Sequence, residues 1–214
     1  MQTTNFWLIR HGETEWNALR RLQGWLDIPL SETGRRQAQQ LGAFLLSGAF
    51  NHAIDAVISS DLSRASETAR LAVDTRFGPI QERTELRERC YGIYEGRDWA
   101  LLNGSDPERP HINFRLLDQA VEGGESLAQF AARVQRAFEA LASDFPGKNL
   151  MVFAHGGVID IAWRLSGKVA LDAARPSPIV NTSINQFSIT GEKEWVQIEW
   201  AQVPHLDDAL DDVL

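Results

Sequence analysis

Short apolar runs alternate with segments of helical periodicity along most of this chain. The clearest runs lie at residues 6–10, 56–58 and 150–154, and an apolar face at helical spacing follows each of them. Parallel strands need a long crossover connection, which is usually a helix, so this alternation favours βαβ units. We therefore expect an α/β fold, a three-layer sandwich in which helices flank a mostly parallel central sheet.

Helix starts are predicted at Ser31 and Ser126, because a serine hydroxyl can accept a hydrogen bond from a free N–H at a helix N-terminus. The helix after Ser126 has the longest regular apolar face, and Pro146-Gly147 ends it. Two further helices and two final strands are expected at residues 65–72, 158–165, 184–189 and 195–200.

One segment interrupts this rhythm. Residues 99–123 contain Gly104, Pro107 and Pro110 and have weak periodicity. We interpret residues 1–214 as a single domain that carries a lid-like insertion at 99–123.

Composition excludes several classes of protein. The net charge is −8, from 21 basic and 29 acidic residues, whereas nucleic-acid binders usually have a basic face. No segment approaches the ~20 apolar residues of a membrane span, and no secretory leader is evident at the N-terminus. Cys90 is the single cysteine, which suits a reducing compartment. We expect a cytoplasmic monomer or homodimer that binds a small molecule, not nucleic acid or membrane.

Polar clusters follow three of the predicted strands, at residues 10–14, 60–64 and 155–157. Ligands of open α/β sheets bind at the carboxyl ends of strands, beside the free N–H groups of helix starts. Two histidines (His11, His155) and two arginines (Arg10, Arg64) are therefore expected to converge at one edge of the sheet.

The residue types in this cluster favour phosphoryl chemistry. The five histidines form no zinc-type spacing, no Cys-x-x-Cys is present, and a Gly-x-Ser-x-Gly nucleophile motif is absent. Arginine forks match phosphoryl oxygens, and a neutral histidine can attack phosphorus and hold the group covalently. The prediction is phosphoryl transfer with no metal and no other cofactor.

The residues around His11 also resemble a known family. Residues 8–17 (LIRHGETEWN) are similar to the signature of the histidine phosphatase superfamily, in its phosphoglycerate-mutase-like branch. Further segments resemble the later motifs of that family in the same order, at 24–34, 59–69, 86–96, 123–126 and 154–157. Residues 181–183 resemble its closing strands, and the insertion is unmatched.

The resemblance implies a role for each matching residue. His11 would be the nucleophile that becomes a phosphohistidine, and Arg10 and Arg64 would clamp the phosphoryl oxygens. Asn17 would add a neutral donor, and His155 a second cationic donor for the charge that develops at phosphorus.

A single carboxyl group can protonate the leaving oxygen and later deprotonate water. The family motif points to Glu88, with Glu85 as its rival. Since nearby cations would oppose protonation of Glu88, we expect Arg87 and Arg89 to point away from it. The remaining predicted substrate contacts are Gly24, Gly156, Arg20, Arg21 and Trp25, and Arg109 and Arg115 are further candidates.

The length and sequence of the insertion distinguish a phosphatase from a mutase within the resembling family. The resembling mutases carry a longer insert with an Arg-Arg-Ser-Tyr-type segment, and residues 97–123 contain no arginine pair. We therefore predict a metal-independent phosphomonoester hydrolase for a small phosphorylated metabolite. The alternatives are a cofactor-dependent phosphoglycerate mutase and an α-ribazole phosphatase-type salvage enzyme. Cys90 is interpreted as a small core side chain.

Overall fold

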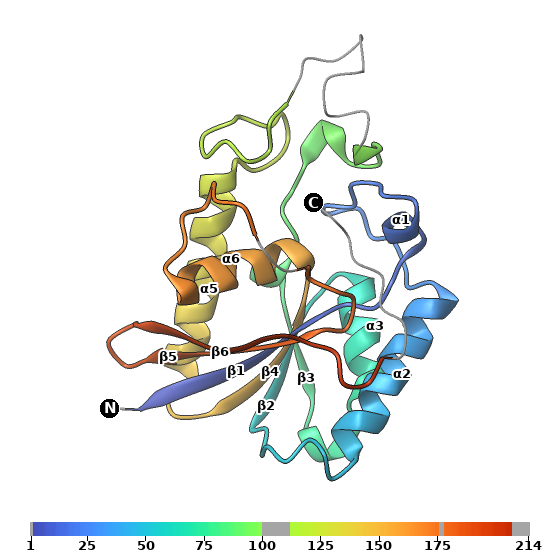
Figure 1. The fold of residues 1–214 in the computed structure, drawn as a ribbon, viewed down its shortest axis with the longest axis vertical. Coiled ribbons are helices and arrows are strands. Elements are labelled where there is room, and N and C mark those ends of the chain that lie inside the picture. The colour runs from blue at the N-terminus through green and yellow to red at the C-terminus, as the bar shows by residue number, and fades with distance from the viewer. Residues whose placement is uncertain (1, 100–111, 176–177, 207–214) are drawn as a thin grey trace.

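The computed structural model describes residues 2–99, 112–175 and 178–206. It contains a six-stranded sheet in the order β3-β2-β4-β1-β5-β6 (Figure 1). The strands are β1 (Thr3–Arg10), β2 (Ala56–Ser60), β3 (Ile80–Arg83), β4 (Asn149–Ala154), β5 (Ile184–Thr190) and β6 (Trp195–Gln202). The pairs from β3 to β1 are parallel, and β5 is antiparallel to both of its neighbours. The expected mostly parallel α/β sheet is thus confirmed.

The edge strand β3 was not among the predicted strands. Its sequence, Ile80-Gln81-Glu82-Arg83, has one apolar residue, and no side chain in it is fully buried. An edge strand next to solvent needs no apolar run, so hydrophobicity gave no signal for it.

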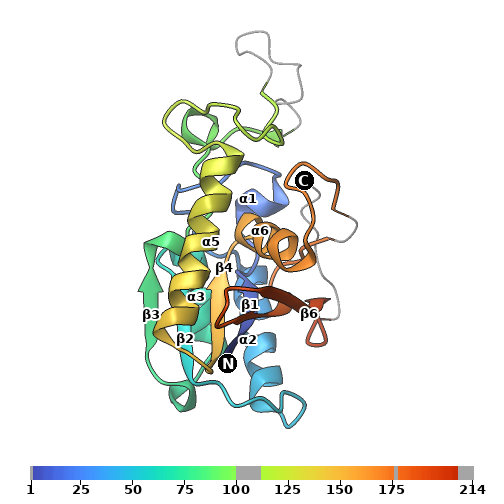
Figure 2. The same cartoon turned by 90° about the vertical axis from the view of Figure 1, so that its left-hand side faces the viewer.

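Helices cover both faces of the sheet (Figures 1 and 2). One face carries α2 (Glu32–Leu46) and α3 (Ser63–Ala72), and the other carries α5 (Leu127–Asp144) and α6 (Gly156–Gly167). Successive side chains of a strand point to opposite faces. Accordingly Phe6 and Leu8 pack toward α5 and α6, whereas Trp7 and Ile9 pack toward α2 and α3.

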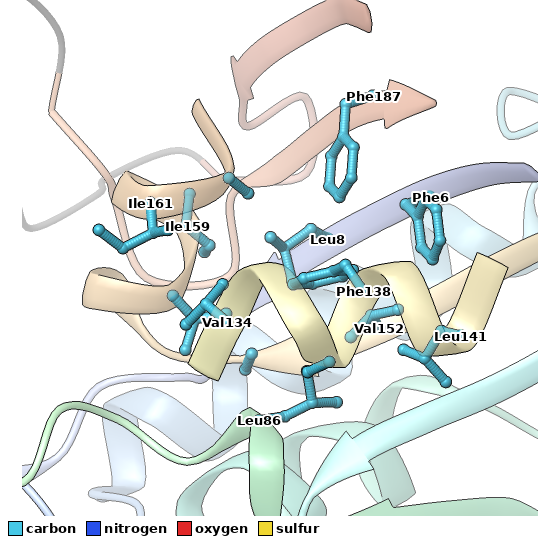
Figure 3. Close-up of a cluster of buried hydrophobic side chains, with 14 of the residues drawn as sticks. Phe6, Leu8, Leu86, Val134, Phe138, Leu141, Val152, Ile159, Ile161 and Phe187 are labelled. Atoms are coloured by element: carbon cyan, nitrogen blue, oxygen red, sulfur yellow. The ribbon is translucent and has the colours of Figure 1, made fainter. Parts of the chain in front are cut away.

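The larger core lies between the sheet and α5 (Figure 3). Phe138 meets Phe6 edge to face at 5.3 Å between ring centroids, and Phe187 stacks on Phe6 at 4.9 Å. Val134 on α5 is also fully buried in this cluster. The regular apolar spacing seen in the sequence after Ser126 is therefore the face that α5 buries against the sheet.

The predicted helix starts are confirmed. The Ser31 hydroxyl accepts a hydrogen bond from the Gly34 N–H at the start of α2, and the Ser126 hydroxyl accepts one from the Gln129 N–H at the start of α5. Helix α5 ends at Asp144, just before Pro146-Gly147. In the described part of the chain no helix has the length and apolarity to cross a membrane.

The parallel strands β2, β4 and β1 are adjacent, and Arg10 pairs with Ala154 in register. Their carboxyl ends therefore meet at one edge of the sheet. Short 3-10 helices η2 (Thr84–Leu86) and η3 (Gly92–Tyr94) lie in the segment after β3, and α1 (Glu15–Ala18) follows β1. Of the predicted insertion, residues 100–111 lie outside the described residues.

Candidate active site

Two histidines lie side by side at the carboxyl edge of the sheet. His11 follows β1 and His155 follows β4, and their ring centroids are 5.2 Å apart. The His11 Nδ1 lies 2.7 Å from the carbonyl oxygen of Gly12. A carbonyl can only accept a hydrogen bond, so Nδ1 carries the proton and donates it. The lone pair is then on Nε2, the nitrogen available for attack on phosphorus.

The surroundings of His11 keep its ring neutral. Burial lowers the pKa of His11 well below its ordinary value, and the cations of Arg64 and Arg10 act in the same direction. The hydrogen bond to Gly12 opposes this shift and is the smallest of the four effects. A histidine must be neutral to act as a nucleophile, so the two arginines prepare His11 as well as attract an anion.

A close backbone approach supports the loop after β1. A Cβ at Gly12 would lie 2.5 Å from the carbonyl oxygen of Gly34, so only glycine fits. The loop therefore packs directly on the start of α2.

Arg64 is the most buried cation of the site. It is the second residue of α3 and only 1% exposed, and its two Nη atoms donate to the carbonyls of Leu26 at 2.9 Å and Gly24 at 2.8 Å. Its Nε has no partner among the described residues. Burial lowers the pKa of Arg64 to about 10, so the group is still charged at neutral pH. Arg10 ends β1 and is also buried, and its Nη1 donates to the carbonyl of Ile179.

His155 lies behind His11 and is completely buried. Its Nε2 is 2.9 Å from the Ser60 hydroxyl, and its Nδ1 has no partner in the described part of the chain. Burial lowers the pKa of His155 well below its ordinary value, and the positive charges of Arg64 and Arg10 act in the same direction. The sequence led us to expect a cation, but the ring is neutral here, because it is desolvated among other positive groups. A bound phosphoryl dianion would raise this pKa again.

Glu88 approaches the histidines from the segment between η2 and η3. Its Oε1 accepts a hydrogen bond from the Arg89 backbone N–H at 2.7 Å, and its Oε2 accepts one from the Gly157 N–H at 2.9 Å. A Cβ at Gly157 would lie 2.1 Å from Oε1, so a side chain there would displace the Glu88 carboxylate from this position. Glu85, the predicted rival, is exposed and does not line the pocket at His11.

The arginines on either side of Glu88 point away from it, as predicted. Arg87 forms a bidentate pair with Asp61 and lies over the Trp25 ring, 5.0 Å from its centroid. Arg89 donates instead to the carbonyls of Phe114 and Glu125. The carboxylate of Glu88 therefore has no salt bridge from its chain neighbours.

The sequence analysis missed Arg133, on α5. Its guanidinium donates to the carbonyls of Glu85, Arg87 and Glu88, at 2.8–3.0 Å, and to both carboxylate oxygens of Glu125. Arg133 thus fixes the backbone that carries Glu88. The signal in the sequence was weak, since an arginine eight residues after a glutamate is typical of any solvated helix.

Most of the predicted site residues line a small pocket of about 60 Å³, whereas His155, which is completely buried, does not. Eight of them line it: Arg10, His11, Asn17, Arg21, Gly24, Arg64, Glu88 and Gly156. Tyr91, Arg175 and Gln23 also line it and were not predicted as site residues. The Thr14 N–H and hydroxyl both donate to the Asn17 Oδ1, which identifies the other amide atom as the Nδ2 donor. We call this space the phosphoryl pocket.

Two predicted substrate contacts do not line the phosphoryl pocket. Arg20 is exposed on the loop after α1. Trp25 is 40% exposed and donates from Nε1 to the Glu88 carbonyl at 2.7 Å, so it supports the Glu88 segment from outside. Arg115 lies on the rim of a second cavity, and Arg109 falls outside the described residues.

Two further expectations concern metal binding and Cys90. Across residues 2–99, 112–175 and 178–206, no group of three His, Cys, Asp or Glu could hold a metal ion. Cys90 is partly buried, and its thiol donates to the Gly123 carbonyl. Burial, together with the charges of Glu95 and Glu125, raises the pKa of the Cys90 thiol, which disfavours a reactive thiolate.

Comparison with known proteins agrees with this geometry. Residues 6–202 match the profile of the histidine phosphatase superfamily, branch 1. The chain is 34% identical over 209 residues to a metal-independent phosphoserine phosphatase of Arabidopsis thaliana, covering 96% of this chain and 84% of that protein. It is 34% identical over 210 residues to phosphoglycerate mutase-like protein 4 of the same plant, covering 94% and 86%.

Solved structures show the same fold. YhfR of Bacillus stearothermophilus superposes with a TM-score of 0.81 at 29% identity, covering 94% of this chain and 98% of that one. A mycobacterial glucosyl-3-phosphoglycerate phosphatase superposes with a TM-score of 0.76 at 27% identity, covering 94% and 100%.

Proposed function

This chain belongs to branch 1 of the histidine phosphatase superfamily, and from that membership we propose that it hydrolyses small phosphomonoesters through a phosphohistidine on His11. One observation carries the proposal. A neutral imidazole, with its lone pair on Nε2, lies in a pocket lined by the guanidinium groups of Arg10 and Arg64. Such a pocket attracts the phosphoryl group and presents a nucleophile to it.

In the first step the His11 Nε2 forms a bond to phosphorus while the ester P–O bond breaks. Arg10, Arg64 and Asn17 stabilise the charge on the equatorial oxygens, and His155 becomes a further donor as the phosphoryl charge raises its pKa. Glu88 gives its proton to the leaving alcohol oxygen.

Glu88 has to be protonated for that step. In the second step the carboxylate of Glu88 takes a proton from water. The water oxygen bonds to phosphorus, the P–N bond breaks, and phosphate leaves. The two N–H groups of Arg89 and Gly157 stabilise the carboxylate form that this step needs.

The mutase is the second candidate, because phosphoglycerate mutase-like protein 4 is among the similar proteins. A mutase must bind a three-carbon acid phosphate in two orientations, which needs cations beyond those that hold the transferred group. Arg21 and Arg175 are the additional arginines among the described residues that line the phosphoryl pocket, and Arg175 pairs with Asp160 at 3.4 Å. This arrangement favours hydrolysis.

The test measures phosphate release from a panel of phosphomonoesters, and isomerisation of 3-phosphoglycerate with and without 2,3-bisphosphoglycerate. We expect phosphate release, and a protein-bound phosphate label that is acid-labile and base-stable. Efficient isomerisation that depends on the bisphosphate would contradict the proposed phosphatase activity and show that the protein is a mutase. The expected cytoplasmic monomer or homodimer is tested by light scattering and cell fractionation.

A further inference from the structure

A second, larger cavity of about 560 Å³ adjoins the phosphoryl pocket. Tyr91, Trp99 and Arg175 line both spaces, so the two are neighbours. We call the larger space the side chamber. Its walls come from the start of α5, from one side of α6 and from the loops at 112–115 and 171–175. Figure 1 shows both loops on the same side of the molecule as the start of α5.

Apolar and aromatic side chains form most of the side chamber. The buried lining residues include Leu127 and Phe130 on α5 and Ile161 on α6. The Phe114 ring lines the cavity from the loop at 112–115. Phe114 meets Tyr91 edge to face at 5.1 Å and Trp99 at 5.7 Å between centroids. Three rings in mutual contact give a rigid wall, against which a flat or apolar group would pack well.

Asp160 and four arginines are the charged residues among the described lining of the side chamber, the arginines being Arg89, Arg115, Arg164 and Arg175. Asp160 on α6 pairs with Arg164 at 2.8 Å and with Arg175 at 3.4 Å. Arg164 also donates to the carbonyls of Ala170 and Ala173. An acidic group on a substrate would have to compete with Asp160 for these arginines.

The remaining buried cation is held in the same way. Arg89 is 3% exposed, donates to the carbonyls of Phe114 and Glu125, and lies over the rings of Tyr91 and Phe114 at 5.5 and 5.4 Å. It therefore stabilises the aromatic wall, and its Nη2 is buried without a hydrogen-bond partner among the described residues.

The general acid lies at the border between the two spaces. Gly157 lines the side chamber, and its N–H donates to the Oε2 of Glu88, which lines the phosphoryl pocket. The ester oxygen that Glu88 protonates would sit at this border, with phosphorus on the side of His11. The carbon skeleton of the leaving alcohol then extends into the side chamber.

We propose that the side chamber binds the leaving group, and that this group is a bulky, ring-bearing, uncharged alcohol and not a three-carbon acid. The inference rests on the proposed phosphatase function and adds the class of substrate. The size of the side chamber supports this proposal, because pockets of about 300–1,000 Å³ enclose drug-sized ligands. The lining of the side chamber supports it as well, because burial of an apolar ring against an apolar wall makes the binding free energy more favourable.

The experiment compares ethyl phosphate, 2-phenylethyl phosphate and phosphoserine. All three are alkyl esters, and the first two differ by a single phenyl ring. We expect kcat/KM to be higher for 2-phenylethyl phosphate than for ethyl phosphate by roughly 10- to 100-fold, as burial of one aromatic side chain suggests. Phosphoserine should be no better than ethyl phosphate.

The variant Ala174→Trp tests the position of the ring. Ala174 lies on an exposed loop and lines the side chamber, so tryptophan there occupies the cavity without entering the core. It should remove most of the advantage of 2-phenylethyl phosphate and change kcat/KM for ethyl phosphate less than about threefold. Ala140→Trp, on an exposed position of α5 that does not line the chamber, is the matched control and should preserve the preference.

Each outcome is decisive. Equal rates for the two esters, a preference for phosphoserine, or an equal loss on both esters in Ala174→Trp would overturn the assignment of the side chamber and leave the phosphatase intact. No phosphate release from any ester would instead refute the proposed function. Calorimetric binding of the same esters to His11→Ala measures the ring preference without turnover.

Discussion

The phosphoryl pocket and the side chamber are neighbours, but they are built in different ways. The pocket takes Arg10 and His11 from the end of β1, Arg64 and Gly156 from the first turns of α3 and α6, and Glu88 from the segment between η2 and η3. Arg10, His11 and Arg64 all bind backbone carbonyls. The chamber takes much of its wall from the loops at 112–115 and 171–175. The difference teaches that the sheet fixes the chemistry, whereas loops that can change without disturbing the sheet set the choice of substrate.

The largest expected effect is the loss of His11. His11→Ala should lower kcat on every phosphomonoester by roughly 10⁴-fold or more, because the covalent route needs its Nε2. Phosphate release measures it, and thermal unfolding shows that the variant is folded. Substantial turnover by a folded His11→Ala protein would remove the phosphohistidine from the mechanism. A chamber variant, in contrast, should change only the ratio between substrates.

Arg64→Lys keeps the charge but loses the fork that binds the carbonyls of Gly24 and Leu26. We expect kcat/KM to fall by roughly 10²- to 10³-fold, as for the loss of one oxyanion donor, and equally for small and bulky esters. Arg70→Lys, on the exposed side of the same helix, is the control and should retain wild-type activity. A loss confined to bulky esters would mean that Arg64 acts on the leaving group in the side chamber and not on the phosphoryl group.

Arg133→Lys should lower kcat by about 10-fold with little change in KM, because Arg133 positions Glu88 and does not line the phosphoryl pocket. The pH profile of kcat should shift, since the hydrogen bonds that hold the Glu88 carbonyl and its segment are altered. Arg136→Lys, also on α5 but exposed, is the matched control. An unchanged pH profile with a lower melting temperature would mean that Arg133 is merely structural.

The pocket, but not the chamber, should make stability depend on pH. The folded pKa values of His11 and His155 lie well below 6.5, and the unfolded chain takes up protons near that pH. The unfolded state then binds more protons, so this stability is present above pH 6.5 and is lost as pH falls toward the folded pKa values. These two groups should lower the free energy of unfolding by up to about 2.7 kcal/mol per pH unit, and His205, whose pKa burial lowers to about 4, adds to this slope.

Urea unfolding between pH 7 and pH 5 measures this slope, and His155→Gln should reduce it by about a third, because His11 and His205 still contribute. Histidine is absent from the described residues that line the side chamber, so Ala174→Trp should leave the slope unchanged. A stability that does not vary over this range would contradict the neutral state of both rings.

The smallest expected effect is that of chelation. EDTA should change kcat by less than about twofold, because the proposed steps use only side chains and water. Inactivation by EDTA, with recovery on addition of a metal, would contradict the mechanism at its first step.

The sequence predicted the phosphoryl pocket better than the side chamber, because the residues of the pocket lie next to recognisable strands and helix starts. The groups of the phosphoryl pocket follow apolar strands or start helices, so periodicity and local motifs placed Arg10, His11 and Arg64 near one another. Tyr91 and Arg175 lie outside those positions, and their place between the two cavities depends on loop packing. Trp25 was predicted as a wall of the site, but its indole N–H reaches the Glu88 carbonyl instead.

The sequence by itself determined the α/β sheet, the starts of α2 and α5, and the order of the family motifs, because each of these depends on residues close together in the chain. Only the tertiary structure decided the neutral state of His155, the support of Glu88 by Arg133, and the side chamber. The physical reason is that burial, electrostatic fields and cavities arise between segments that are distant in sequence, and no local pattern records their separation.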